Sequence, residues 1–366
     1  MRDLFPDVKP SQILVGLEFA GHHGFTFAHF LREKGYAVVS VLPAHTKRTK
    51  EIEDNSPEKN DQKDASLICK LVGDGTFVPF PFLEEPYTSL KLLVSQRHRL
   101  SVEENRFKNR LQGILDLTWP DFMGHFSDIT KKTPIALLTR WPLPEDLAEA
   151  NPRTVQQFIK KTSRGQIRPE KIRAIIQSAH DTVALKDGRD LRRMEIRNLL
   201  ERWRLVRKQM AELDTQIAAL VERCPEAKVL TTVPEVSTLS AAVIVSELGT
   251  PQSYEHPRQV LKLAGMNLVG STGGTSVFGR RWQSKRGRPM LRRELFLIAG
   301  RWCGPRGLYR EGYRRMLERN GMRRTKAVAA LARKLVPLLF RVMKSGEPFD
   351  LERFLENRHR RGEAVA

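Results

Sequence analysis

Three acidic residues near the start of the chain have the types and spacing for metal-dependent phosphate chemistry. Asp61 and Asp64 are one helical turn apart, so a helix that starts near Asn60 would point both side chains the same way. Glu18 follows an apolar run at residues 13–17, where an acid buried without a partner would be unfavourable. Mg²⁺ prefers carboxylate and water oxygens and bridges phosphate oxygens. We therefore predict a Mg²⁺ site formed by Glu18, Asp61 and Asp64.

The two aspartates also have a simpler interpretation. Asp61 is suited to cap the amino end of a helix, and Asp64 is suited to its first turn, where an acid interacts favourably with the helix dipole. For these two residues alone this interpretation would prevail. Glu18 is harder to explain in that way, because it ends a strand-like apolar run.

The excess of basic residues indicates which class of binding partner to expect. The chain has 63 Lys and Arg residues against 42 Asp and Glu, a formal net charge of +21, and residues 280–341 alone hold 19 basic residues against 3 acids. Such an excess favours nucleic-acid backbones or anionic membranes. No run of about 18 apolar residues is present, so we expect no membrane span. The first ten residues do not resemble a signal peptide, and three widely spaced cysteines fit a reducing compartment, so we expect a cytoplasmic protein.

Basic side chains flank the acidic motif and the later glycine-rich segment. We predict that they contact nucleic-acid phosphates. They are Lys47, Arg48, Lys50, Arg280, Arg281, Lys285, Arg286 and Arg288.

The N-terminal elements would position the acids. Residues 13–17 and 36–42 read as strands on either side of a helix at 25–33, which predicts a βαβ unit and a parallel sheet. Residues 65–72 continue the acidic motif as a helix, and residues 77–82 form an extended exit from the domain.

The middle of the chain is predicted to be helical. Apolar residues recur every seven positions from Leu93 to Ile114, and they alternate in steps of three and four from Ile196 to Leu220. The seam fits two helices that pack within one chain, and it fits equally well an intermolecular coiled coil that sets dimer geometry. Residues 133–184 form a small helical insert between the two helices.

The last third combines helices with a candidate nucleophile. Helices are predicted on both sides of residues 234–237, as in a helix-hairpin-helix or an ordinary helical corner, and again at 258–265, 289–302 and 323–344. Residues 267–287 read as a Gly/Ser/Thr-rich loop. Glycines beside Ser271 would let the backbone close on a phosphate and leave this serine free to attack it, although most such segments are only loops.

Several motifs together resemble the DEDD-type insertion-sequence transposases of bacteria, relatives of the Piv DNA invertases. The motifs follow the family order over nearly the whole chain. They lie at residues 15–22, 55–65, 106–111, 263–268, 284–288 and 346–350.

The resemblance implies a RuvC-like α/β domain with an Asp-Glu-Asp-Asp tetrad, a serine nucleophile in the C-terminal domain and a structured guide RNA. Glu18 matches the second acid of the tetrad, and Asp61 and Asp64 match the third and fourth. Ser271 matches the nucleophile, with Thr272 as the alternative hydroxyl. The first aspartate has no counterpart, so we expect a chain that begins late, lacks the opening strand and binds metal less well.

We therefore predict a DNA transposase or site-specific recombinase that uses Mg²⁺, a guide RNA and a dimer or tetramer of the chain. The rival predictions are a RuvC-like nuclease in which Ser271 is structural, and an impaired nucleic-acid-binding remnant. The expected domains are an incomplete RuvC-like domain at 1–84, a helical coiled-coil region at 85–222, a mostly α C-terminal domain at 223–350 and a basic tail at 351–366.

Overall fold

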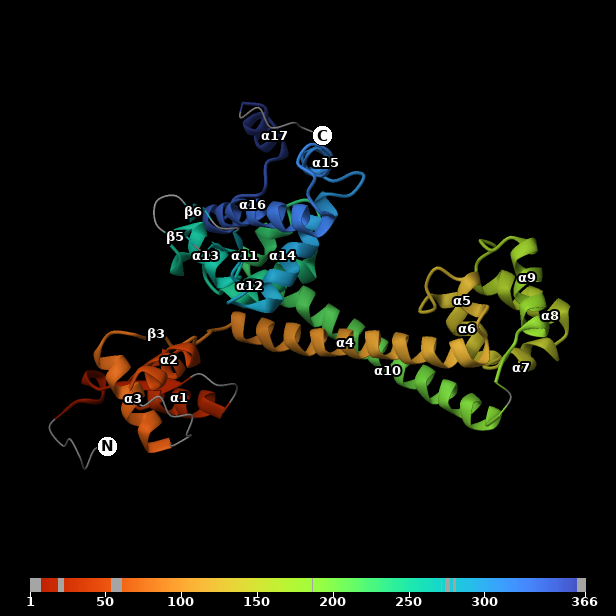
Figure 1. Cartoon of the computed structure of the whole chain (residues 1–366), viewed down its shortest axis with the longest axis horizontal. Coiled ribbons are helices and arrows are strands. Elements are labelled where there is room, and N and C mark those ends of the chain that lie inside the picture. The colour runs from red at the N-terminus through yellow and green to blue at the C-terminus, as the bar shows by residue number, and fades with distance from the viewer. Residues whose placement is uncertain are drawn as a thin grey trace. The chain divides into compact units, whose positions relative to one another are not determined.

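The computed structural model describes residues 8–18, 23–53, 61–185, 187–270, 272–273, 277–278 and 281–360. These residues are mostly helical, with one small mixed sheet and two short strand pairs. The chain divides into two compact units, Met1–Glu84 and Glu85–Ala366 (Figure 1).

The first unit contains the predicted βαβ motif. Strands β1 (Leu14–Glu18) and β2 (Ala37–Val41) pair in parallel, with Glu18 opposite Val41, and helix α1 (His23–Glu33) connects them. The predicted parallel pairing is confirmed for these two strands, and a further strand, β3 (Val78–Pro79), adds to β2 in the antiparallel sense. Proline is tolerated in β3 because this strand lies at the edge of the sheet.

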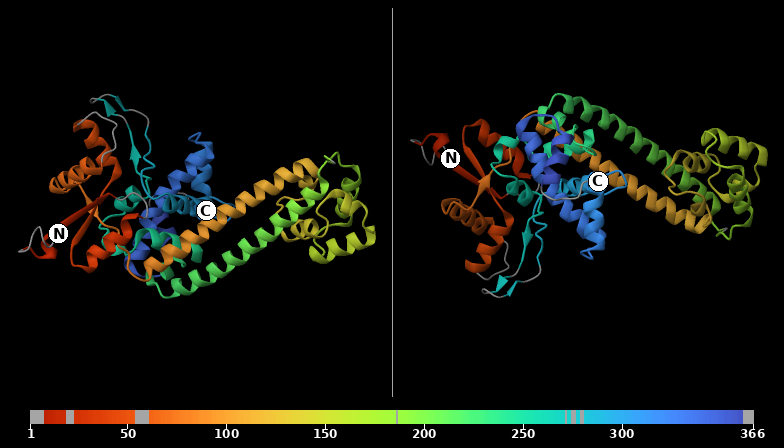
Figure 2. Two further views of the ribbon diagram at one scale, coloured as in Figure 1. Left: turned by 90° about the horizontal axis from the view of Figure 1, so that it is seen from below. Right: turned by 90° about the horizontal axis from the view of Figure 1, so that it is seen from above.

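Helices cover both faces of this sheet (Figure 2). On one face, α1 buries Ala28 and Leu31. On the other, α3 (Asp61–Gly73) packs Leu67 and Leu71 in one apolar cluster with Val41. Helix α2 (Pro43–Glu53) follows β2 directly and contacts α3. The sheet is thus closed by the helix that carries both aspartates.

The second unit is built on a pair of long helices, α4 (Tyr87–Thr118) and α10 (Arg189–Glu222). Their apolar seam packs within the chain: Leu100 contacts Met210 and Leu213 in one cluster, and the Phe107 and Trp203 rings stack with centroids 5.6 Å apart. Ion pairs flank the seam, with Arg97 Nε 3.0 Å from Asp214 Oδ1. Of the two interpretations of the seam, the structure shows intrachain packing.

A helical lobe occupies one end of this pair. It comprises α5 (Phe122–His125), α6 (Lys132–Arg140), α7 (Pro144–Ala148), α8 (Pro152–Thr162) and α9 (Pro169–Asp181). Three of these helices begin with proline, whose fixed φ suits the first helical position and whose missing N–H is not needed there. Trp119, Phe122 and Leu137 lie in a core shared with α4 and α10.

The other end of the helix pair joins the C-terminal part of the unit. Leu90 and Ile217 belong to its core, to which several C-terminal helices contribute buried residues. The helices are α11 (Pro225–Leu230), α12 (Thr238–Leu248), α13 (Pro257–Leu263), α14 (Pro289–Trp302), α15 (Arg310–Glu318), α16 (Arg324–Ser345) and α17 (Leu351–Arg360). Residues 351–360, expected to be a tail, form a helix because Phe354 packs on the Trp302 and Tyr309 rings.

Candidate active site

A glycine allows α3 to lie directly on β1. A Cβ atom added to Gly16 would be 2.5 Å from Val72 Cγ2 and 3.0 Å from Ile68 Cγ2, closer than side-chain carbons approach each other. The side chain at position 16 would therefore point at α3. Gly16 is thus the residue of β1 that is small enough for α3 to pack directly on the strand.

Glu18 lies on the same side of β1 as that contact. Side chains alternate across a strand, so positions 16 and 18 share a face. Glu18 is half-buried, and its register partner Val41 is fully buried against α3. The carboxyl end of β1 therefore places Glu18 on the sheet face that α3 covers.

Asp64 lies on the matching side of α3. Asp64, Ile68 and Val72 are spaced four residues apart, so they form one row along the helix. The last two residues of this row contact Gly16. Glu18 thus lies two residues after the apolar contact along β1, and Asp64 lies one helical turn before it along α3.

Lys50 of α2 forms an ion pair with Asp64. Its Nζ donates to Asp64 Oδ1 at 2.7 Å, and the two side chains are 22% and 36% exposed. The assignment of Lys50 to nucleic-acid phosphates did not anticipate this pair. Of its neighbours, Lys47 pairs with Glu51 at 3.8 Å and Arg48 is exposed.

Asp61 is the first residue of α3, close to the predicted helix start, but its side chain lies outside the described part of the structure. Within the described residues, no three His, Cys, Asp or Glu side chains form a group that could hold a metal ion. Glu18 thus lies on the sheet face that α3 covers, and Asp64 lies on the α3 row that contains Ile68 and Val72. The convergence of the three acids stays a prediction.

The segment expected to be a glycine-rich loop contains strands. β4 (Leu268–Val269) pairs with β7 (Trp282–Gln283), and β5 (Thr272–Gly273) pairs with β6 (Val277–Phe278), both antiparallel. We call these four strands the arm (Figure 2). Ser271 lies outside the described residues, and Thr272 opposes Phe278 in β5 with its side chain likewise not described.

Two glycines fix the base of the arm. Gly265 has a φ of +65°, and a Cβ added to Gly287 would lie 2.3 Å from the Leu263 carbonyl oxygen. Backbone hydrogen bonds join the same segments, from Lys285 N to Gly265 O and from Arg288 N to Leu263 O. The two motifs at 263–268 and 284–288 thus form a single support from which the arm extends.

The predicted basic residues of this region differ in their surroundings. Arg281, Lys285 and Arg286 are exposed, and Arg280 lies outside the described residues. Arg288 is half-buried, and its guanidinium donates to the main-chain carbonyl of Glu247. The exposed three remain suited to a phosphate backbone, whereas Arg288 holds α14 against α12.

A polar network, which the sequence did not reveal, supports the turn before α12. Glu235 adopts a φ of +65°, and its carbonyl accepts a hydrogen bond from Arg301 Nε at 3.0 Å. The Pro234 carbonyl accepts another from Trp302 Nε1 at 2.6 Å. Ser237 caps α12 by accepting from Ser240 N at 3.1 Å. Residues of α14 therefore hold both carbonyls of the hairpin turn.

Glu294 is the centre of this network. Its carboxylate is 8% exposed, accepts from Ser240 Oγ at 2.6 Å and lies 3.6 Å from Arg301 Nη2. Truncating Glu294 to alanine would leave Ser240 without this acceptor and Arg301 without its carboxylate.

We expect Glu294→Ala to lower the free energy of unfolding by about 2–3 kcal/mol, because the buried Ser240 hydroxyl loses its acceptor and Arg301 loses its carboxylate partner. The control is Glu318→Ala, which breaks an exposed pair with Arg314 at 3.5 Å and should cost less than about 0.5 kcal/mol. Urea unfolding measures both variants. Equal unfolding midpoints for the two variants would contradict a structural role for the network.

Cysteine chemistry is disfavoured at two positions. Burial raises the pKa of the Cys224 and Cys303 thiols to about 11, so both are protonated at neutral pH and are poor nucleophiles.

No helix within the described residues has the length and apolar character needed to cross a lipid bilayer.

Comparison with known proteins agrees with the resemblance drawn from the motifs. A transposase family model of the DEDD IS110 type matches residues 2–120, and the model of the IS116/IS110/IS902 transposase family matches residues 227–306. Together they cover more than half of the chain. The chain is also 26% identical over 293 residues to an uncharacterized 43.6 kDa protein of insertion element IS110 from Streptomyces coelicolor, over 79% of this chain and 71% of that protein. The chain is therefore a transposase of the IS116/IS110/IS902 family.

Proposed function

We propose that this transposase cuts and rejoins the DNA of an insertion sequence with two chemical centres. Glu18, Asp61 and Asp64 would hold Mg²⁺ at the carboxyl end of β1, and Ser271, which lies between β4 and β5 in the sequence, would be the nucleophile. The observation that supports the proposal is the close approach of α3 to Gly16, because Glu18 shares a strand face with Gly16 and Asp64 shares a helix row with Ile68 and Val72.

The donor set fits the metal. Three carboxylates supply the hard oxygen ligands that Mg²⁺ prefers. When bound, Mg²⁺ would polarise a phosphate oxygen and stabilise the charge that develops there. Lys50 now neutralises part of the Asp64 charge at 2.7 Å, and it would have to release this carboxylate to the ion.

The serine would supply a covalent route to strand exchange. Its Oγ would attack the phosphorus, form a serine–phosphate bond and break the bond to the leaving ribose oxygen, which takes up a proton. A hydroxyl of the incoming strand would then reverse this step and restore the serine. Arg281, Lys285 and Arg286 would hold the flanking phosphates, since all three are exposed beside the arm.

Substituting Ser271→Ala separates this proposal from a RuvC-like nuclease. We expect it to abolish the covalent protein–DNA adduct, seen as a shifted band on a denaturing gel. Thr272→Val is the paired variant, because it removes the neighbouring hydroxyl with little change in shape. Loss of the adduct in the threonine variant alone would assign the nucleophile to Thr272. Cleavage at the normal rate in both variants, without an adduct in any protein, would favour the nuclease.

Two partners belong to the proposal. A guide RNA is suggested by the family resemblance and by the 19 basic residues in positions 280–341. Assembly into a dimer or tetramer would bring the two centres of different chains together. Because the α4–α10 seam packs within the chain, the subunits would have to meet through other surfaces.

A further inference from the structure

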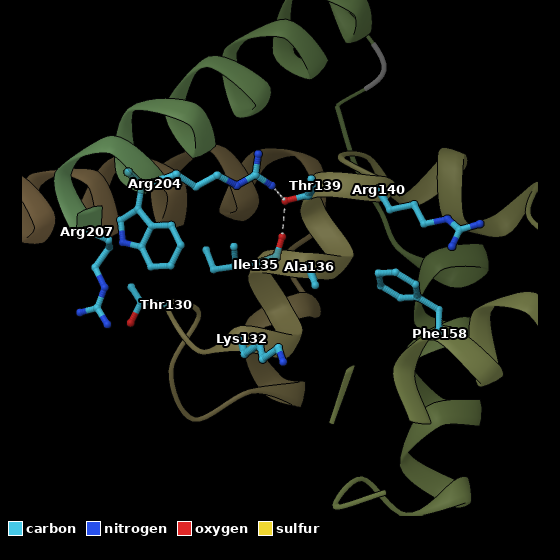
Figure 3. Close-up of a pocket in the computed structure, with 10 residues that line it drawn as sticks. Thr130, Lys132, Ile135, Ala136, Thr139, Arg140, Phe158, Arg204 and Arg207 are labelled. Atoms are coloured by element: carbon cyan, nitrogen blue, oxygen red, sulfur yellow. Dashed lines mark hydrogen bonds between the residues drawn. The ribbon is translucent and has the colours of Figure 1, made fainter. Parts of the chain in front are cut away.

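A solvent-open hollow of about 510 Å³ lies on the helical lobe, lined by residues of α6, α8 and α10 (Figure 3). We call it the lobe pocket. Its lining residues fall between positions 130 and 207, outside both segments that match the transposase models. Nothing in the candidate active site accounts for it.

The lobe pocket combines an apolar floor with a cationic rim. Ile135, Ala136 and Phe158 supply apolar surface. The charged side chains that line it are all basic: Lys132, Arg140, Arg204 and Arg207. An anion with an apolar portion would therefore be recognised better than a purely polar ion.

Most of this positive charge is not neutralised by carboxylates of the described chain. Arg207 pairs with Glu104 at 3.1 Å. Arg204 Nη2 instead donates to the Thr139 hydroxyl at 2.7 Å, and Arg140 lies 5.0 Å from the centre of the Phe158 ring. Lys132 is exposed and has no carboxylate within ion-pair distance among the residues described. The rim thus presents three cations to an outside anion.

This combination matches single-stranded nucleic acid. Phosphates bind to Lys and Arg along a groove, while unpaired bases pack on aromatic and apolar side chains. A duplex hides its base faces in the stack and would leave the floor of the pocket unused. A solvent-open hollow also lets a polymer enter and leave, whereas a free nucleotide is usually enclosed more fully.

We propose that the lobe pocket binds a single-stranded segment of RNA or DNA, with phosphates at Lys132 and Arg204 and a base against Phe158. The inference rests on the proposed function, which provides both an RNA and unpaired DNA as partners. It adds a second nucleic-acid contact, carried by the lobe and distinct from the arm.

The test compares two double variants of the full-length protein that change the net charge equally. Lys132→Glu with Arg204→Glu alters the lobe pocket. Lys160→Glu with Lys208→Glu alters exposed residues of α8 and α10 that do not line it. Fluorescence anisotropy with labelled 20-nucleotide single-stranded RNA and DNA, each titrated at several salt concentrations, measures Kd.

We expect the pocket variant to bind at least one of the two strands about tenfold more weakly than the control variant. Its salt dependence should be shallower by about 1.4 in the logarithmic slope, since each lost phosphate contact on a single strand contributes about 0.7. A loss confined to RNA or to DNA supports the proposal and identifies the strand. Equal Kd values and slopes in the two double variants would overturn it.

This outcome is separable from failure of the proposed function. The assay involves no strand cleavage, and it can be repeated with Asp64→Asn. If that variant loses cleavage and keeps strand binding, while the pocket variant binds like its control, the lobe proposal fails alone.

Discussion

Replacing Asp64 with asparagine is expected to slow DNA strand cleavage by about a thousandfold and to leave DNA affinity within about twofold of the wild type. A bound Mg²⁺ contributes several kcal/mol to the charge that develops on a phosphate, and about 4 kcal/mol corresponds to roughly three powers of ten in rate. Asparagine has the same shape as aspartate, so the packing of α3 on β1 through Ile68 and Val72 is preserved. Gel-based cleavage of a labelled substrate measures the rate.

The control for this variant is Asp74→Asn. Asp74 is exposed just beyond the end of α3, so its substitution removes the same charge from the same unit. Loss of the ion pair with Lys50 adds little, because partly exposed pairs contribute roughly 0–1 kcal/mol. If Asp64→Asn and Asp74→Asn cleave equally, the carboxylate has no catalytic role. If no protein cleaves DNA, wild type included, the chain is the impaired nucleic-acid-binding remnant.

The second large effect concerns the support of the arm. Gly287→Ala should lower the free energy of unfolding by about 3 kcal/mol, because the new Cβ would lie 2.3 Å from the Leu263 carbonyl and 2.4 Å from Gly265 N. These atoms belong to the main chain and cannot rotate away. We also expect strand exchange to fall by more than tenfold, since the base of the arm must shift.

Gly300→Ala is the matched control. Gly300 lies within α14, and nothing comes within 4 Å of the Cβ that alanine would add. The same substitution should therefore stabilise the protein by about 0.5–1 kcal/mol, because alanine favours the helix. Denaturant midpoints compare the two variants. A neutral Gly287→Ala would show that the close approach at the arm base can relax without cost.

Local sequence patterns predicted the elements that have strong periodicity. The strands at β1 and β2, the start of α3 near Asn60 and the extent of α14 follow from apolar spacing and from helix-start residues. Helix α2 was missed, because its residues Pro43–Glu53 are mostly polar and show no clear apolar stripe. The strands of the arm were missed because each has only two residues, too few for an alternating pattern.

Long-range polar contacts were beyond the reach of the sequence. Lys50 and Asp64 are fourteen residues apart and were assigned to different tasks, yet they pair at 2.7 Å. Ser240 and Glu294 are separated by more than fifty residues, and neither lies in a motif from which a hydrogen-bond partner could be predicted. Such pairs depend on how helices pack against one another, and the local spacing of residues does not determine this packing. The shared side of α3 on which Asp64, Ile68 and Val72 lie could be predicted, because residues four apart form one row on any helix.

The central claim is that Glu18, Asp61 and Asp64 meet at one divalent cation. Anomalous diffraction from crystals soaked in Mn²⁺, which scatters strongly and binds the same oxygen ligands as Mg²⁺, tests it most directly. We predict one strong peak at the carboxyl end of β1, within about 2.5 Å of carboxylate oxygens of Glu18 and of both aspartates. A peak elsewhere, or Glu18 turned away from Asp64 in the presence of the ion, would contradict the account.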